Sequence, residues 1–191
     1  MILIKNGRVV DPVTGTDEIM DVLVDGNTIA KTGKDLDVDC AEVIDATGLV
    51  IAPGLVDTHV HFRDPGFTYK EDINTGAAAA ARGGFTMVVC MANTKPAVDN
   101  LDTLKYIQEK GAKTGIHVVQ TVTVTKELAG KELVDMDGLA AAGAAGFTDD
   151  GIPIMDEKLL LEAMEKAREL DLPISLHEED PLFIVQPGVN Q

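Results

Sequence analysis

Tryptophan is absent from this 191-residue sequence, and cysteine is scarce, with only Cys40 and Cys90. The two cysteines lie far apart and form no Cys-x-x-Cys pair, which argues against a disulfide framework and is typical of a reducing cytosol. The sequence also lacks an apolar run near the roughly 20 residues that span a bilayer, and its first residues lack the apolar core of a signal peptide. We therefore expect a cytoplasmic protein without a membrane partner.

Basic residues are few as well. The chain carries 16 Lys and Arg residues against 32 Asp and Glu residues, a formal net charge of −16. This excess of negative charge argues against nucleic acid or an anionic membrane surface as a partner, whereas one arginine can still bind an anionic small molecule locally. Hydrophobic residues make up 45% of the chain, which is enough to form a sizeable core.

Residues 1–50 show no helical pattern of convincing length. The alternating stretches "MILIKNG" and "DVLVDGNTIA" each meet a turn pair, Asn6-Gly7 and Asp25-Gly26, which is typical of short strands joined by turns. We expect residues 1–50 to form a small N-terminal β unit and residues 51–191 to form the N-terminal part of a second domain.

After Pro53-Gly54, strand-like and helix-like segments alternate with a repeat of about 30 residues, the size of a βα unit. This alternation predicts an α/β fold in which helices cover a parallel sheet. The predicted strands are Leu55–His61, Thr86–Met91, Ile116–Val124, Ala145–Thr148 and Ile174–His177, and the predicted helices are 74–83, Leu101–Lys113, Leu133–Ala142 and Glu157–Leu170. The predicted apolar face of the last helix comprises Leu160, Leu161, Met164 and Ala167.

Two architectures fit this alternation, a doubly wound open sheet and a (β/α) barrel. The first βα turn reads "HVHFRDPGF" and not Gly-x-Gly-x-x-Gly, which argues against a nucleotide-binding sheet. Polar residues follow several strands at their carboxyl ends, where a barrel carries its active site. Because about five strands are found and a barrel needs eight, we predict a partial (β/α)8 TIM-type barrel of about the first five βα units.

The first predicted barrel strand ends with His59 and His61. Residues two apart in a strand point to the same face, so the two imidazoles could bind one ion of zinc or another first-row metal. Two surface histidines at a strand end are the alternative. Asp149 and Asp150 follow the fourth strand, where one carboxylate is expected to face the interior and could bridge two metal ions. An Asp-rich turn is the alternative there.

The remaining candidates also follow strands. His177 ends the fifth strand, whereas His117 begins the third and is interpreted as structural. The planar guanidinium of Arg63 suits bidentate binding of a carboxylate, and Asn93, after the second strand, could hydrogen-bond the same group. A local structural role is the alternative for each, and the acidic stretch "HEED" is interpreted as solvated charge. Together these positions predict a dinuclear metal site beside a carboxylate pocket.

These segments resemble a known family. "GLVDTHVHFRDPG" is similar to the Asp-x-His-x-His signature of the amidohydrolase superfamily, and its Arg-Asp-Pro-Gly extension resembles the dihydroorotases of the long bacterial type. "TGAAAAARGGFTMVVCMANTKP", "FTDDG" and "SLHEED" are similar to later parts of that family, in the same order. The resemblance covers essentially the whole chain, although Met-Ala-Asn-Thr stands where the family often has Met-Pro-Asn-Thr.

The resemblance implies a zinc-dependent enzyme that interconverts N-carbamoyl-L-aspartate and L-dihydroorotate in pyrimidine biosynthesis. It implies that residues 1–50 are part of a composite β-sandwich and that residues 51–191 are the N-terminal part of a truncated metal-dependent hydrolase barrel. His59 and His61 would bind one Zn²⁺ and His177 a second, and Asp150 would bridge them where many relatives use a carboxylated lysine. The residues that it implies for substrate binding are His61, Arg63 and Asn93. A further histidine ligand and the aspartate that acts as general base are expected beyond residue 191, so the chain is expected to be an incomplete and inactive fragment.

Rival functions stay open at this point. A dihydropyrimidinase (hydantoinase) or an allantoinase would be a cyclic amidohydrolase with no need of an arginine for a substrate carboxylate. A non-catalytic scaffold for a transcarbamoylase would usually lose metal ligands, whereas the ligands that fall within this chain are present. The expected partner is a small-molecule substrate, and a homodimer and an association with aspartate transcarbamoylase are further expectations.

Overall fold

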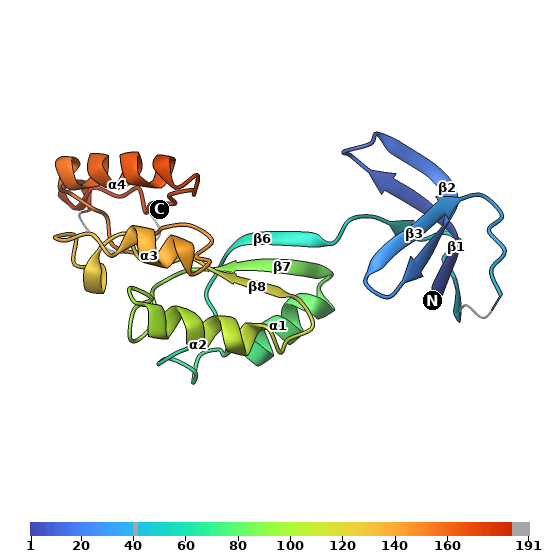
Figure 1. The fold of residues 1–191 in the computed structure, drawn as a ribbon, viewed down its shortest axis with the longest axis horizontal. Coiled ribbons are helices and arrows are strands. Elements are labelled where there is room, and N and C mark those ends of the chain that lie inside the picture. Colours follow the sequence, from blue (N-terminus) through green and yellow to red (C-terminus); the bar gives the residue numbers. More distant parts are fainter. Residues whose placement is uncertain (40–41, 185–191) are drawn as a thin grey trace. The chain divides into compact units, whose positions relative to one another are not determined.

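The computed structural model describes residues 1–39 and 42–184 (Figure 1). The chain divides into two compact units, Met1–Gly54 and Leu55–Gln191. Cys40 lies outside the described residues, and Cys90 is a free, buried thiol. Among the helices of the described part, none combines the length and the apolar character that a membrane crossing requires.

The first unit is a five-stranded sheet of β1 (Ile2–Asp11), β2 (Thr16–Asp25), β3 (Thr28–Gly33), β4 (Glu42–Asp45) and β5 (Val50–Ile51). The strand order is β3-β2-β1-β4, and β5 also pairs with β1. Neighbours β1, β2 and β3 are antiparallel, whereas β4 and β5 run parallel to β1. Consistent with the sequence pattern, the described part of residues 1–50 contains no helix.

The turn predicted at Asn6-Gly7 is wrong, because these residues form a bulge inside β1. Asn6 has a φ of +62°, and its backbone N–H donates to the buried carboxylate of Asp21 at 2.8 Å. Gly7 permits a close approach, since a Cβ there would lie 2.3 Å from Ile51 Cδ1. An Asn-Gly pair readily adopts backbone conformations with positive φ, which occur in β-bulges as well as in turns.

The second unit begins with three parallel strands in chain order, β6 (Leu55–Val60), β7 (Phe85–Cys90) and β8 (His117–Gln120). The helices α1 (Ile73–Arg82) and α2 (Leu101–Gly111) connect them and lie side by side on one side of this sheet (Figure 1). Asp72 caps α1 by accepting from the backbone N–H groups of Asn74 and Thr75. Asn100 caps α2 in the same way.

The fourth and fifth predicted strands are reduced to single bridges. Phe147 pairs in parallel with Val122 on one side and with Ile174 on the other. The parallel order of the sheet therefore continues beyond β8, although these segments are too short to count as strands. The predicted third strand also ends early, at Gln120, because the buried chain that follows it turns toward Val98 and Asp149 for its backbone hydrogen bonds.

The remaining helices are α3 (Met136–Ala141), α4 (Glu157–Glu169) and two short 3₁₀ turns, η1 (Lys126–Leu128) and η2 (Pro181–Phe183). The predicted apolar face of α4 is displaced: Ala163 and Ala167 are buried, whereas Leu161 and Met164 are more than half exposed. Small side chains face the core because they let the helix approach it closely. The large apolar residues mark a second face, which no described segment covers.

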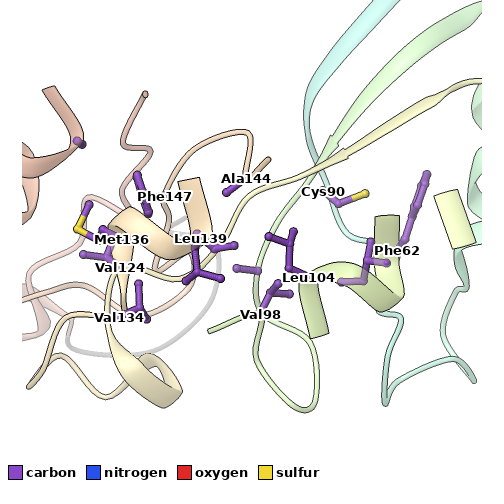
Figure 2. Close-up of a cluster of buried hydrophobic side chains, with 14 of the residues drawn as sticks. Phe62, Cys90, Val98, Leu104, Val124, Val134, Met136, Leu139, Ala144 and Phe147 are labelled. Atoms are coloured by element: carbon purple, nitrogen blue, oxygen red, sulfur yellow. The ribbon is translucent and has the colours of Figure 1, made fainter. Parts of the chain in front are cut away.

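One hydrophobic core joins the strands and helices of the second unit (Figure 2). Phe147 and Leu104 are completely buried within it, together with Leu139 of α3. Phe62, which directly follows His61, packs against α1 at Gly76, where a Cβ would lie 2.5 Å from the Phe62 ring. Since Phe62 is held in the core, the polar residues on either side of it are held at the end of β6.

Candidate metal centre

Three donor side chains converge at the carboxyl end of β6. The Nε2 atoms of His59 and His61 lie 3.5 Å and 3.4 Å from Oδ2 of Asp150. The Asp150 side chain is 13% exposed, whereas the side chains of His59 and His61 are 47% and 28% exposed. The site is therefore open to a ligand from the side of the histidines, with the carboxylate at its base.

His177 approaches the other oxygen of the same carboxylate. Its Nδ1 lies 3.7 Å from Oδ1 of Asp150, while Oδ2 faces His59 and His61. Asp150 therefore lies between His59 and His61 on one side and His177 on the other, and it presents one carboxylate oxygen to each side. This arrangement suits a carboxylate shared by two cations.

Asp149, the neighbour of Asp150, points away from the histidines and is 1% exposed. Its carboxylate accepts from the backbone N–H groups of Val124 at 2.8 Å and Thr125 at 3.1 Å, and from the Thr125 hydroxyl. Burial raises the pKa of Asp149, and these hydrogen bonds offset part of that effect. Asp149 therefore stabilises the chain segment that follows β8. Of the two aspartates, only Asp150 contributes a carboxylate to the site.

Asn93 links two of the donor residues. Its Nδ2 donates to Asp150 Oδ2 at 3.2 Å and to the Asp150 carbonyl at 3.3 Å, so its Oδ1 is left to accept from His61 Nδ1 at 2.9 Å. With a proton on Nδ1, neutral His61 presents the lone pair of Nε2 toward Asp150. The Asn93 amide therefore forms hydrogen bonds with His61 and Asp150. A contact between Asn93 and a substrate stays a prediction.

Glu179 was missed in the sequence, where "HEED" is interpreted as solvated charge. Its Oε2 lies 2.9 Å from Nε2 of His177, on the opposite side of the ring from Asp150. A carboxylate on the second ring nitrogen is the usual partner of a metal-binding histidine. The spacing offered a signal, because residues two apart in an extended segment share a face.

Arg63 lies two residues after His61, in the left-handed region with a φ of +59°. Within residues 1–39 and 42–184 its side chain forms no hydrogen bond and no ion pair. The loop that carries it contacts the loop after β7, because Lys95 N–H donates to the Pro65 carbonyl at 3.1 Å. Gly66 allows this approach, since it has a φ of +93° and a Cβ there would lie 2.0 Å from Lys95 O.

The donor set fits a metal ion. The ligand atoms of His59, His61 and Asp150 all lie within 4.8 Å of one another. In a tetrahedral zinc site, metal–ligand distances of about 2.0 to 2.1 Å place neighbouring ligand atoms about 3.3 Å apart. The observed separations of 3.4 Å and 3.5 Å are close to that value. Imidazole nitrogen with carboxylate oxygen is also a donor combination that zinc accepts.

Comparison with known proteins identifies related sequences. The family model described as "Dihydro-orotase-like" matches residues 48–190. The chain is 60% identical over 191 residues to a dihydroorotase of Clostridioides difficile (strain 630) and 56% identical over 191 residues to one of Clostridium acetobutylicum. Both comparisons cover 100% of this chain and 45% of the relative, so the chain spans less than half the length of these proteins.

Solved structures show the same fold. The L-hydantoinase (dihydropyrimidinase) from Arthrobacter aurescens has a TM-score of 0.80 at 23% identity, covering 96% of this chain and 42% of that one. A crystal structure of a D-hydantoinase has a TM-score of 0.72 at 28% identity, covering 93% and 40%. The family-model match over residues 48–190 and the 60% identity over the whole of this chain lead to one conclusion: the chain belongs to the dihydroorotase-like family.

Proposed function

We propose that this chain is the N-terminal part of a dihydroorotase, which interconverts N-carbamoyl-L-aspartate and L-dihydroorotate in pyrimidine biosynthesis. The observation that carries the proposal is the position of Asp150, with one carboxylate oxygen toward His59 and His61 and the other toward His177. Curated relatives that are 52–60% identical to this chain are named dihydroorotase.

The proposed cofactor is a pair of zinc ions. His59 and His61 would hold the first ion, His177 the second, and Asp150 both. When bound, zinc would make water a nucleophile at neutral pH and would withdraw electrons from the amide carbonyl of the substrate. Asn93 and Glu179 would orient His61 and His177 by accepting from the ring nitrogen that faces away from Asp150.

The residue proposed for substrate binding is Arg63. Both compounds of the proposed reaction carry a carboxylate that the chemistry leaves unchanged, and a guanidinium binds such a group through two parallel hydrogen bonds. The Arg63 side chain has no competing partner in the described chain. Its role is positioning, since a fixed carboxylate aligns the ring amide with the metal centre. His61 and Asn93 stay predicted as further substrate contacts.

Architecture supports a partial (β/α)8 barrel of about five βα units in residues 51–191. Strands β6, β7 and β8 are parallel and in chain order, and the bridges at Phe147 and Ile174 extend that order. The proposed general base is an aspartate in a segment that this chain does not contain. The β unit is proposed to be part of a composite β-sandwich. Cytoplasmic location, a homodimer and association with aspartate transcarbamoylase stay predictions.

A second candidate is a dihydropyrimidinase (hydantoinase), because two of the matching solved structures are named hydantoinase, whereas another, with a TM-score of 0.67, is named dihydroorotase. The identities of the two hydantoinases are only 23% and 28%, however, against 60% for a curated dihydroorotase. Allantoinase belongs to the same group of rivals. Arg63, which has no ion-pair partner among the described residues, favours a substrate with a carboxylate beside the scissile amide.

A substrate panel separates these candidates. The full-length enzyme, with residues 1–191 followed by the segment that completes its relatives, is assayed with dihydroorotate, a 5-substituted hydantoin and allantoin. We expect turnover of dihydroorotate alone, and Arg63→Lys is expected to raise its KM roughly tenfold while the zinc content stays constant. Preferred turnover of hydantoin or allantoin would contradict the proposed substrate. Absence of activity on all three substrates together with absence of bound metal would favour the transcarbamoylase scaffold.

A further inference from the structure

Asp64 is a buried carboxylate that the metal centre does not use. Its side chain is completely buried, and it accepts from Lys110 Nζ at 2.5 Å and from the Tyr106 hydroxyl at 3.0 Å. It also accepts from the backbone N–H of Ile73, the first residue of α1, at 3.3 Å. Tyr106 and Lys110 stand one turn apart on α2, so Asp64 ties the loop after β6 to both helices.

Asp64 is also the immediate neighbour of Arg63. Adjacent residues of opposite charge can pair with each other, and such a pair would neutralise the guanidinium that the proposed function needs. In the structure Asp64 is instead turned to α2, and Arg63 forms no ion pair within the described residues. The chain carries an excess of acidic residues, with a net charge of −16, so an arginine without a carboxylate partner in the described chain calls for an explanation.

We propose that the ion pair with Lys110 fixes the position of Asp64 and neutralises its charge, and thereby keeps Arg63 available for the substrate carboxylate. This inference rests on the proposed function. Lys110 and Asp64 are positioning residues in this proposal, since they act through Arg63. Two features support it. Arg63 has a left-handed backbone, a conformation that non-glycine residues rarely adopt, and the close approach of Gly66 to Lys95 holds the loop at its other end.

The charge state of Lys110 is consistent with this role. The hydrogen bond from its ammonium to Asp64 raises the pKa of Lys110, so the residue is protonated at neutral pH. Without that ammonium, the Asp64 carboxylate would either turn toward Arg63 or stay buried and uncompensated. In both cases its negative charge would oppose the approach of an anionic substrate.

The test compares two single variants of the full-length enzyme. Lys110→Met is expected to raise the KM for dihydroorotate about tenfold, with kcat changed less than about threefold and zinc content unchanged. Asp64→Asn keeps the shape of the side chain, because its amide oxygen can accept from the Ile73 N–H while its amide nitrogen donates to the Tyr106 hydroxyl. This variant is expected to leave KM unchanged or to lower it. Lys105→Met is the matched control, because Lys105 lies on the same helix in an exposed pair with Glu109.

A purely structural role of Asp64 predicts a different effect of these variants on the kinetics. If Asp64 only anchored the loop, Asp64→Asn and Lys110→Met would both raise KM and lower kcat, and this outcome would overturn the proposal. Lys110→Met can fail to fold because it leaves a buried charge unpaired. The double variant Asp64→Asn with Lys110→Met then decides, since the proposal expects a wild-type KM and a raised KM would contradict it.

A second readout does not depend on activity. Phenylglyoxal modifies guanidinium groups that are free to react, and mass spectrometry of the peptide around Arg63 gives the rate. Lys110→Met is expected to slow the modification of Arg63 at least threefold, whereas the unchanged protein and the double variant should react alike. Equal rates in all three would overturn the proposal. If the unchanged enzyme does not turn over dihydroorotate, the proposed function fails and this rate still tests the role of Lys110.

Discussion

At the scale of single residues, two residues adjacent in the chain have different structural roles. Asp149 and Asp150 are chemically identical, yet one is buried against the backbone after β8 and the other stands among histidines. Strand alternation predicted that only one of them would face the site. It could not predict what the other would bind, because Val124 and Thr125 are distant in sequence and reach Asp149 only through the fold.

The pair Asp149 and Asp150 gives the first prediction. Asp150→Ala is expected to lower the zinc content of the full-length enzyme by more than half, since it removes the oxygen atoms that face both groups of histidines. Asp149→Asn is the matched control and should keep its metal. Atomic emission measures both. Loss of zinc from the Asp149 variant alone would show that the assignment is off by one residue.

A second prediction concerns pH. Because burial raises the pKa of Asp149 above its ordinary value of 3.8, the folded chain binds this proton more tightly than the unfolded chain. Its contribution to stability therefore falls as pH rises from that value through the folded pKa. The amide that Asp149→Asn introduces carries no charge, so the variant should gain stability relative to the unchanged chain between about pH 4 and about pH 7.5. Urea unfolding at both values measures the difference, and an opposite trend would contradict the assignment.

At the scale of elements, the sequence predicted the order of strands and helices better than their lengths. The helices α1, α2, α3 and α4 all lie within predicted ranges or within one residue of them. The predicted fourth and fifth strands are only single β-bridges, at Phe147 and Ile174. A short apolar run does not indicate how many of its residues form backbone hydrogen bonds with a neighbouring strand. Glu179 and Asp64 were missed because their partners are set by geometry that no local pattern encodes.

The third prediction tests how two loops position the site. Gly66→Ala places a Cβ at φ +93° and 2.0 Å from Lys95 O, so the loops that carry Arg63 and Asn93 must separate. We expect a rise in the KM for dihydroorotate and a loss of stability well above about 1 kcal/mol. Gly84→Ala is the control, because Gly84 has a φ of +87° with nothing within 4 Å. Equal losses in both variants, by thermal unfolding, would show that the contact is unimportant.

At the scale of the whole molecule, the sheet of the second unit has an open side. Among the described strands β6 pairs only with β7, and Leu55 and Val56 on it are 54% and 52% exposed. A strand edge of this kind usually pairs with further chain. The sequence predicted this from its strand count, since five strands do not close a barrel of eight.

The fourth prediction concerns the activity of residues 1–191 by themselves. Residues 1–191 alone are expected to show no turnover of dihydroorotate, because the proposed general base lies in a segment outside this chain and such a group typically contributes about 10²- to 10⁴-fold. A hydrolysis assay on the purified chain, with its mass verified, is compared with the full-length enzyme. Comparable rates would show that the described residues already contain every essential group.

The carboxylate at the centre of the site has one more consequence. Asp150 is encoded directly in the chain, and no lysine occurs between Ala145 and Pro153 that could be carboxylated in its place. A carboxylated lysine is made from dissolved carbon dioxide after folding, and it is lost again when the gas is removed. If Asp150 is the shared group, as proposed, loading of the centre with metal would not require carbon dioxide, and it would be insensitive to the bicarbonate concentration of the cell.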